Sequence, residues 1–390
     1  MIDCLDLRIS TNIEQKAVDI CANEVLLCEE YLPELRTSLR KLQKKLHLPV
    51  KNKFYHFKSL KTNLFPLTNV AFNKEGSSCV IGSYDRTARL WNVETGTELN
   101  VLQGHKNAVF AVQYNYPACD KISTTSFDKT SKLWATSNGT CLQTFHGHTA
   151  EVVASEFNQL STLLVTASMD STARVYDIET GIEIHSFLNH GGEVIAAHFH
   201  KNENIILTGS FDSNAYLWDL RTKDLIMRLE GHMAELSNCI WNYDHSLIAT
   251  GSIDATARVW DIRGGISSLC HVIDGHNDEV LDICFNYTGT SLATCSNDHS
   301  SKIWSVKDDF HLISTMSGHE AEVSRVRFNP AGNLVLTASA DKTARVWFTE
   351  TGICSQVLSG HTDEVISCEF SYPGNAILTA SKDNTCKIWR

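Results

Sequence analysis

The sequence has 390 residues, of which 43% are hydrophobic and 20% charged, and its formal net charge is −11. We expect no membrane insertion, because no run of about 18 apolar residues occurs, and no nucleic-acid partner, because residues 62–390 carry a net charge of −14. The 13 cysteines are scattered and form no C-x-x-C pair, which predicts reduced thiols in a cytoplasmic protein.

Residues 1–53 are expected to form a small helical domain followed by a linker. Apolar residues within 12–29 follow a helical stripe, and Pro33 suits the start of a second helix. The second stripe is too short for a stable coiled coil, so we expect a helical hairpin that docks on the rest of the chain. Its basic face would suit an acidic surface and includes Arg36, Arg40 and Lys44.

From residue 54 onward the chain repeats with a spacing of 42 to 44 residues. Each unit carries one aromatic landmark, and these are Trp91, Trp134, Tyr176, Trp218, Trp260, Trp304, Trp347 and Trp389. An Asp lies six residues before each landmark and a Ser two residues before each Asp, as in the pairs Ser126 and Asp128, Ser252 and Asp254, and Ser339 and Asp341. Seven units also have a His upstream, namely His105, His148, His190, His232, His276, His319 and His361.

Short runs rich in Val, Ile and Thr separate these landmarks and end in turn residues such as Pro-Gly-Asn. Short strands at this period predict four-stranded blades around an axis. Eight units over residues 54–390 therefore predict an all-β, eight-bladed β-propeller with a small N-terminal α-helical segment.

The last unit ends at Arg390, one residue after Trp389, and so lacks residues for a fourth strand. Residues 57–63 align with the fourth strand that leads into the second unit. We therefore expect residues 54–61 to pair with the last blade and close the ring, because an open ring would leave two unpaired strand edges.

The pattern G-H, then S-x-D, then W six residues after the Asp resembles the WD-repeat family, and the resemblance covers residues 54–390. It implies a buried hydrogen-bonded chain of Trp, Ser, His and Asp in each blade, with a shortened chain in the first unit, which lacks the His. A hydrolase triad or a metal site is not expected, because the set recurs once per blade. We expect no catalytic, cofactor-binding or metal-binding residue.

Two series of residues are candidates for partner binding. The residue before each turn Asp is large and apolar in five successive units: Tyr84, Phe127, Met169, Phe211 and Ile253. The third residue after the His is acidic in six units: Glu151, Glu193, Glu235, Glu279, Glu322 and Glu364. In WD-repeat proteins the first series lies on one rim near the channel, so both series could contact a partner. Two alternatives are that the apolar side chains tuck under neighbouring loops, and that basic residues two before each Trp pair with carboxylates between blades.

Several stretches, among them "GSYDRTARLW", "FDKTSKLW" and "SKDNTCKIWR", resemble one subgroup, the outer-row dynein arm assembly factors with WD repeats. This resemblance implies a monomeric, non-enzymatic adaptor between the outer-arm dynein complex and an intraflagellar transport complex B subunit. It would act in the cytoplasm, the cilium or flagellum and the basal body region. The alternative is a general WD scaffold such as a ubiquitin-ligase substrate receptor.

Overall fold

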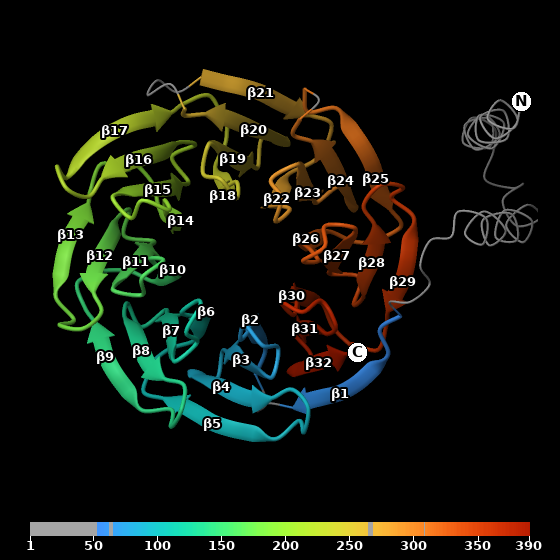
Figure 1. Ribbon diagram of the computed structural model, residues 1–390, viewed down its shortest axis with the longest axis horizontal. Helices are drawn as coiled ribbons and strands as arrows, with labels where there is room; N and C mark the ends of the chain where they lie inside the picture. The colour runs from blue at the N-terminus through green and yellow to red at the C-terminus, as the bar shows by residue number, and fades with distance from the viewer. Residues whose placement is uncertain (1–52, 62–64, 264–267, 308) are drawn as a thin grey trace, which may run out of the picture. The chain divides into compact units, whose positions relative to one another are not determined.

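The computed structural model describes residues 53–61, 65–263, 268–307 and 309–390. The residues from Phe54 onward form one compact unit, a ring of eight four-stranded antiparallel sheets (Figure 1). The predicted eight-bladed propeller is confirmed, and no helix occurs within the described ranges. The expected helical hairpin, with Arg36, Arg40 and Lys44, lies outside the described residues.

Each of the first seven blades is built from four consecutive strands, from the innermost to the outermost. Blades 1 to 4 contain β2 (Leu67–Phe72), β3 (Ser78–Ser83), β4 (Thr87–Asn92) and β5 (Glu98–Gln103); β6 (Val109–Tyr114), β7 (Lys121–Ser126), β8 (Ser131–Ala135) and β9 (Cys141–Phe145); β10 (Val152–Phe157), β11 (Leu163–Ser168), β12 (Ala173–Asp177) and β13 (Glu183–Phe187); and β14 (Val194–Phe199), β15 (Ile205–Ser210), β16 (Ala215–Asp219) and β17 (Asp224–Leu229).

Blades 5 to 7 repeat this order, and blade 8 takes its outermost strand from the start of the described chain. These blades contain β18 (Leu236–Trp241), β19 (Leu247–Ser252), β20 (Thr256–Asp261) and β21 (Ser268–Asp274); β22 (Val280–Phe285), β23 (Ser291–Ser296), β24 (Ser300–Ser305) and β25 (Leu312–Ser317); β26 (Val323–Phe328), β27 (Leu334–Ser339), β28 (Ala344–Phe348) and β29 (Cys354–Leu358); and β30 (Val365–Phe370), β31 (Ile377–Ser381) and β32 (Thr385–Trp389) with β1 (His56–Lys61).

The two ends of the propeller unit meet in blade 8, where β1 pairs antiparallel with β32 (Figure 1). Leu60 lies opposite Cys386, and Tyr55 and Arg390 exchange two main-chain hydrogen bonds of 2.6 and 2.9 Å. Phe54 is 3% exposed and packs in the core between blades 7 and 8, near Phe370. These contacts satisfy the outer edge of the last blade, which would otherwise expose unpaired N–H and C=O groups.

The hydrophobic core is divided among the blade interfaces. Trp134 of blade 2, for example, packs on Val80 and Leu90 of blade 1, and Trp347 of blade 7 packs on Ile303 of blade 6. The second strand of each blade is covered on both faces, so its residues are almost all buried. Each in-register aromatic residue therefore joins its own blade to the preceding one.

Strand direction separates the turns into two ends of the ring. The turns between the second and third strands lie at the same end as the loops that join successive blades. We call this end the turn rim. It carries both residue series that the sequence analysis proposed for partner binding.

Candidate interaction surface on the turn rim

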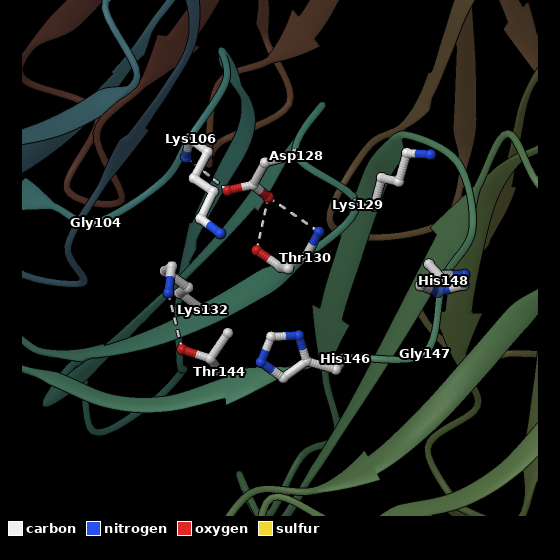
Figure 2. Close-up of a pocket in the computed structure, with 10 residues that line it drawn as sticks. All are labelled: Gly104, Lys106, Asp128, Lys129, Thr130, Lys132, Thr144, His146, Gly147 and His148. Atoms are coloured by element: carbon white, nitrogen blue, oxygen red, sulfur yellow. Dashed lines mark hydrogen bonds between the residues drawn. The ribbon is translucent and has the colours of Figure 1, made fainter.

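The turn from Ser126 to Thr130 in blade 2 shows how the rim is held in place. The Asp128 carboxylate accepts hydrogen bonds from Thr130 N (3.0 Å), Thr130 Oγ1 (2.6 Å) and Lys106 N (2.8 Å) (Figure 2). The last of these bonds ties the loop between blades 1 and 2 to the turn. Lys129, next in the turn, has a φ of 71°.

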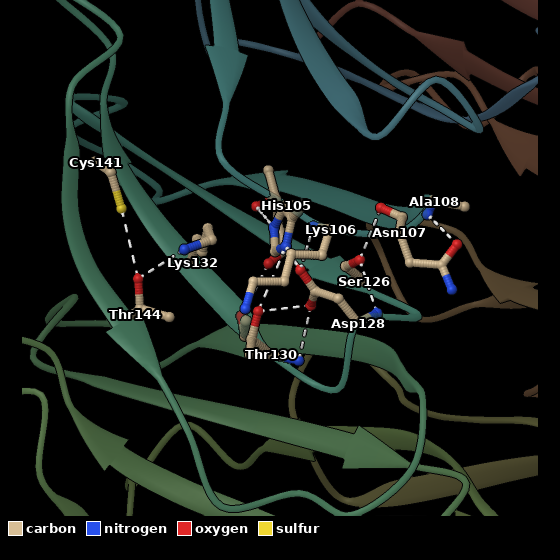
Figure 3. A network of polar contacts seen from close by, with 12 residues as sticks. His105, Lys106, Asn107, Ala108, Ser126, Asp128, Thr130, Lys132, Cys141 and Thr144 are labelled. Carbon is tan, nitrogen blue, oxygen red and sulfur yellow. Dashed lines mark hydrogen bonds and ion pairs between the residues drawn. The ribbon is translucent and has the colours of Figure 1, made fainter.

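A buried hydrogen-bonded chain connects this turn to the core of blade 2, and Figure 3 shows its rim end at His105 and Asp128. Trp134 Nε1 donates to Thr124 Oγ1 (2.8 Å), which contacts His105 Nε2 (2.7 Å), while His105 Nδ1 contacts Asp128 Oδ2 (2.8 Å). The carboxylate can only accept, so Nδ1 carries the imidazole proton and Nε2 accepts from the threonine hydroxyl. Every polar atom of the chain is thereby satisfied.

The expectation that serine stands in this chain is wrong. Ser126 lies two residues nearer the strand end than Thr124, so its hydroxyl reaches only the main chain of the rim. It donates to Asn107 O (3.0 Å) and accepts from Asp128 N (3.0 Å). The serine therefore supports the turn, whereas the threonine links the tryptophan to the histidine.

Blades 4 to 8 contain the same chain of Trp, Thr, His and Asp. The sets are Trp218, Thr208, His190 and Asp212; Trp260, Thr250, His232 and Asp254; Trp304, Thr294, His276 and Asp298; Trp347, Thr337, His319 and Asp341; and Trp389, Thr379, His361 and Asp383. Ser252 and Ser339 each accept from the main-chain N–H of the turn Asp, as Ser126 does.

Two blades depart from this arrangement. In blade 3 the Tyr176 hydroxyl donates to His146 O (3.1 Å), and Thr166 Oγ1 contacts His148 Nε2 (2.8 Å) and Arg174 O (3.4 Å) but no landmark indole. In blade 1 Ile81 occupies the threonine position, and the Trp91 indole N–H has no partner among the described residues. The chain is therefore shorter in these two blades.

The histidines of these chains are buried, and burial lowers the pKa of those in blades 5 to 8. Burial lowers the pKa of His232 from its ordinary value, although Asp254 opposes that change. Burial alone would raise the pKa of the Asp254 carboxyl, but hydrogen bonds from Thr256, Met233 N and His232 lower it to about 2. An imidazole whose two nitrogens are both hydrogen-bonded holds the rim turn in a fixed position relative to the core of the blade.

Main-chain hydrogen bonds bring the two predicted rim series together. Met169 N donates to Glu151 O (2.9 Å), and Phe211 N donates to Glu193 O (2.8 Å). The equivalent bonds join Ile253 to Glu235, Asn297 to Glu279, Ala340 to Glu322 and Lys382 to Glu364. The apolar series and the acidic series therefore lie side by side in blades 3 to 5, at one end of the ring.

Most side chains of the apolar series are only partly exposed to solvent. Tyr84 is 44% exposed, whereas Phe127, Met169, Phe211 and Ile253 are half-buried. The Tyr84 and Phe127 rings meet edge to face with centroids 6.4 Å apart, and the exposed Phe110 ring stacks on Phe127 at 5.4 Å. We call Tyr84, Phe110 and Phe127 the aromatic trio. Phe110 was not among the predicted residues; it stands at the start of β6, where blades 4 and 6 have Ile195 and Leu281.

The acidic series faces solvent over much of the rim, since Glu193, Glu235 and Glu322 are exposed. Among the six glutamates, Glu364 alone forms an ion pair with a described rim side chain, that of Lys382. The alternative in which basic residues pair with carboxylates between blades is wrong for the pairs seen here. Arg89 pairs with Glu98 (2.6 Å) and Arg174 with Glu183 (2.5 Å), each within one blade.

The opposite end of the ring carries a hollow of about 770 Å³ that sequence analysis did not predict. Tyr243, which is 72% exposed, lines it together with Tyr287, Trp241 and His245. Burial lowers the pKa of His245 to about 4. The signal in the sequence was a tyrosine in the turn after the first strand of four blades, at 116, 243, 287 and 372.

No group of three or more His, Cys, Asp or Glu side chains suited to a metal ion occurs in the part of the chain that the structure describes. Among the same residues, no helix is long and apolar enough to cross a membrane.

Comparison with known proteins gives one family and two kinds of similar protein. The model of the family "WD domain, G-beta repeat" matches residues 56–92, 96–135, 139–177, 181–219, 223–261, 267–305, 310–347 and 352–390. "Dynein assembly factor with WD repeat domains 1" is 47% identical over 122 residues in Danio rerio, 47% over 121 residues in Homo sapiens and 45% over 121 residues in Mus musculus. These alignments cover 31% of this chain and 29% of each relative, so less than a third of the relatives' length is matched. The crystal structure of Ika8, a computationally designed protein, aligns with a TM-score of 0.76 and 27% identity over 86% of this chain and 99% of that one.

Proposed function

This chain belongs to the WD domain, G-beta repeat family, and from that premise we propose that it is a non-enzymatic scaffold for the assembly of outer-arm dynein. In its full form the proposal is an adaptor between preassembled outer-arm dynein and a subunit of intraflagellar transport complex B. It would act as a monomer in the cytoplasm, the basal body region and the motile cilium or flagellum.

The observation that carries the proposal is the identity of 45 to 47% with dynein assembly factors over about 120 residues. The non-enzymatic part is supported by the repeated histidines. Their ring nitrogens are both occupied by Thr and Asp partners, as in His232 and His319, and the rings are buried. The transport link draws on the subgroup resemblance of the sequence.

We place the partner surface on the turn rim. The aromatic trio offers rigid apolar side chains, which often anchor protein partners. The exposed glutamates would steer a basic partner segment toward the rim. Arg36, Arg40 and Lys44 remain proposed partner residues outside the described part of the chain.

The test is affinity capture from ciliated cells with the full tagged chain. We expect wild type to recover outer-arm dynein chains and transport complex B subunits, and Tyr84→Ala/Phe127→Ala to recover about tenfold less. Tyr243→Ala, an exposed tyrosine at the opposite end of the ring, is the matched control and should behave like wild type. Melting temperatures within a few degrees of wild type would show that the variants are folded.

Two results would contradict this proposal. Recovery of cullin adaptors without ciliary proteins would favour a ubiquitin-ligase substrate receptor. Equal recovery by wild type and the rim variant would show that dynein or transport partners bind elsewhere on the chain.

A further inference from the structure

A basic pocket of about 310 Å³ opens where blade 2 meets the loop into blade 3 (Figure 2). Three lysines line it, Lys106 from the loop before blade 2, Lys129 from the rim turn and Lys132 from β8. His146 closes the side nearest blade 3. Figure 2 shows the Lys106 and Lys132 ammonium groups on one side of Thr130 and the Lys129 side chain extending away on the other.

The pocket has a carboxylate, but its oxygens are already engaged. Asp128 Oδ2 contacts His105 Nδ1 and Lys106 N, and Oδ1 accepts twice from Thr130. Lys106 and Lys129 form no ion pair among the residues that the structure describes, and both are exposed. Lys132 Nζ donates only to the neutral Thr144 hydroxyl (2.8 Å). With three lysines and one carboxylate in its lining, the pocket carries a net positive charge.

Comparison between blades shows what blade 2 lacks. Opposite the landmark aromatic residue, the outer strand carries Glu98 in blade 1 and Glu183 in blade 3, and each pairs with the Arg two residues before that landmark. In blade 2 the same register position is Cys141, opposite Trp134. Blade 2 thus has the cation, Lys132, without the glutamate of its two neighbours. Blades 4 to 7 also lack that glutamate, with Leu225, Leu269, Leu312 and Cys354 in the same register position.

The acidic rim position is also uncharged in this blade. Ala108 stands where six other blades have the rim glutamate, and its main-chain oxygen accepts from Phe127 N (3.0 Å). The rim position and the outer-strand position are therefore both uncharged in blade 2, which carries the lysines at 106, 129 and 132.

One residue of the aromatic trio, Phe127, belongs to the same turn as two residues that line the pocket. Phe127 directly precedes Asp128 and Lys129, and it stacks on Phe110. A partner segment could thus place an apolar side chain on the trio and an anionic side chain in the pocket. Rigid aromatic anchors beside a charge-complementary site are typical of peptide recognition.

We propose that the pocket of Lys106, Lys129 and Lys132 binds a phosphorylated serine or threonine side chain of a partner protein, next to an apolar residue held by the aromatic trio. A phosphoryl group has a charge near −2 and three acceptor oxygens, which match three ammonium donors better than a single carboxylate does. This inference rests on the proposed scaffold role in one respect, because it assumes that the ligand is a segment of another protein. It does not require that protein to be dynein.

The test uses the full chain and three immobilised libraries of degenerate nonapeptides, with phosphoserine, serine or glutamate fixed at the centre. We expect wild type to bind the phosphoserine library about tenfold more than the serine library, since charge-assisted hydrogen bonds contribute at least that factor. Lys106→Ala/Lys129→Ala and Lys132→Met should each lower that binding about tenfold. Inorganic phosphate should compete for the phosphoserine library only at high concentration.

Lys342→Ala is the matched control, because Lys342 occupies in blade 7 the turn position of Lys129, with a φ of 69°, and is also exposed. It should bind like wild type. Melting temperatures establish that each variant is folded. Equal binding to the serine and phosphoserine libraries, or unchanged binding by the lysine variants, would overturn the proposal. Equal binding to the glutamate library would reassign the pocket to ordinary acidic peptides, and binding of inorganic phosphate alone would remove the partner segment.

Discussion

Removing the hydroxyl of Thr250 tests whether threonine is the link between the tryptophan and the histidine. Thr250→Val keeps the side-chain shape but leaves two buried groups without a partner, Trp260 Nε1 at 3.0 Å and His232 Nε2 at 2.8 Å from the lost oxygen. Each unpaired buried polar group costs about 1–3 kcal/mol. We therefore expect the free energy of unfolding to fall by about 2–5 kcal/mol.

Blade 3 supplies a matched control for this substitution. Thr166 is as buried as Thr250, but its hydroxyl contacts His148 and no landmark indole, because Tyr176 donates to His146 O. Thr166→Val should therefore cost about half as much, about 1–3 kcal/mol. The difference between the two variants measures the indole hydrogen bond.

The assay is urea denaturation followed by tryptophan fluorescence and circular dichroism, with equal m-values required for the comparison. Ser252→Ala gives a second contrast, since Ser252 only accepts from Asp254 N and donates to main-chain oxygens. We expect it to cost about 1 kcal/mol. A larger loss for Ser252→Ala than for Thr250→Val would refute the reasoning and restore serine to the chain.

Three further outcomes are expected. Phe54→Ala should lower the free energy of unfolding by about 3–5 kcal/mol, because Phe54 fills the core where the ring closes. Substitution of the neighbouring exposed residue, Tyr55→Ala, should cost under about 1 kcal/mol. Equal changes in melting temperature for the two variants would contradict this role for the closing segment. The free energy of unfolding should fall as pH drops below about 6.5 and again below about 4. The reason is that the pKa values of His232 and Asp254 are lower in the folded state, so the unfolded chain binds more protons. Urea midpoints that stay constant from pH 7.5 to 3.5 would contradict this prediction. Arg327→Met should cost about 3–5 kcal/mol, because it leaves the buried Asp282 carboxylate without its cation at 2.6 Å, and a calorimetric melting temperature equal to that of wild type would contradict it.

The repeat spacing was enough to predict the architecture. Eight in-register landmarks from Trp91 to Trp389 specify eight like units, because each Trp must be buried against the preceding blade. The short last unit pointed to a missing strand, which β1 supplies in the structure. Both inferences rest on counting and on the need to pair strand edges, which are properties of the sequence alone.

Side-chain contacts between distant residues were decided only by the tertiary structure. Thr250 and Ser252 share one strand face, so spacing could not show which of them meets the Trp260 indole; the diagonal register of β19 and β20 does. Likewise the pocket of blade 2 arises because β9 places Cys141 where neighbouring blades have a glutamate. A periodic sequence determines which structural unit is repeated. The residues that differ from one blade to the next form a site only when neighbouring strands bring their side chains together.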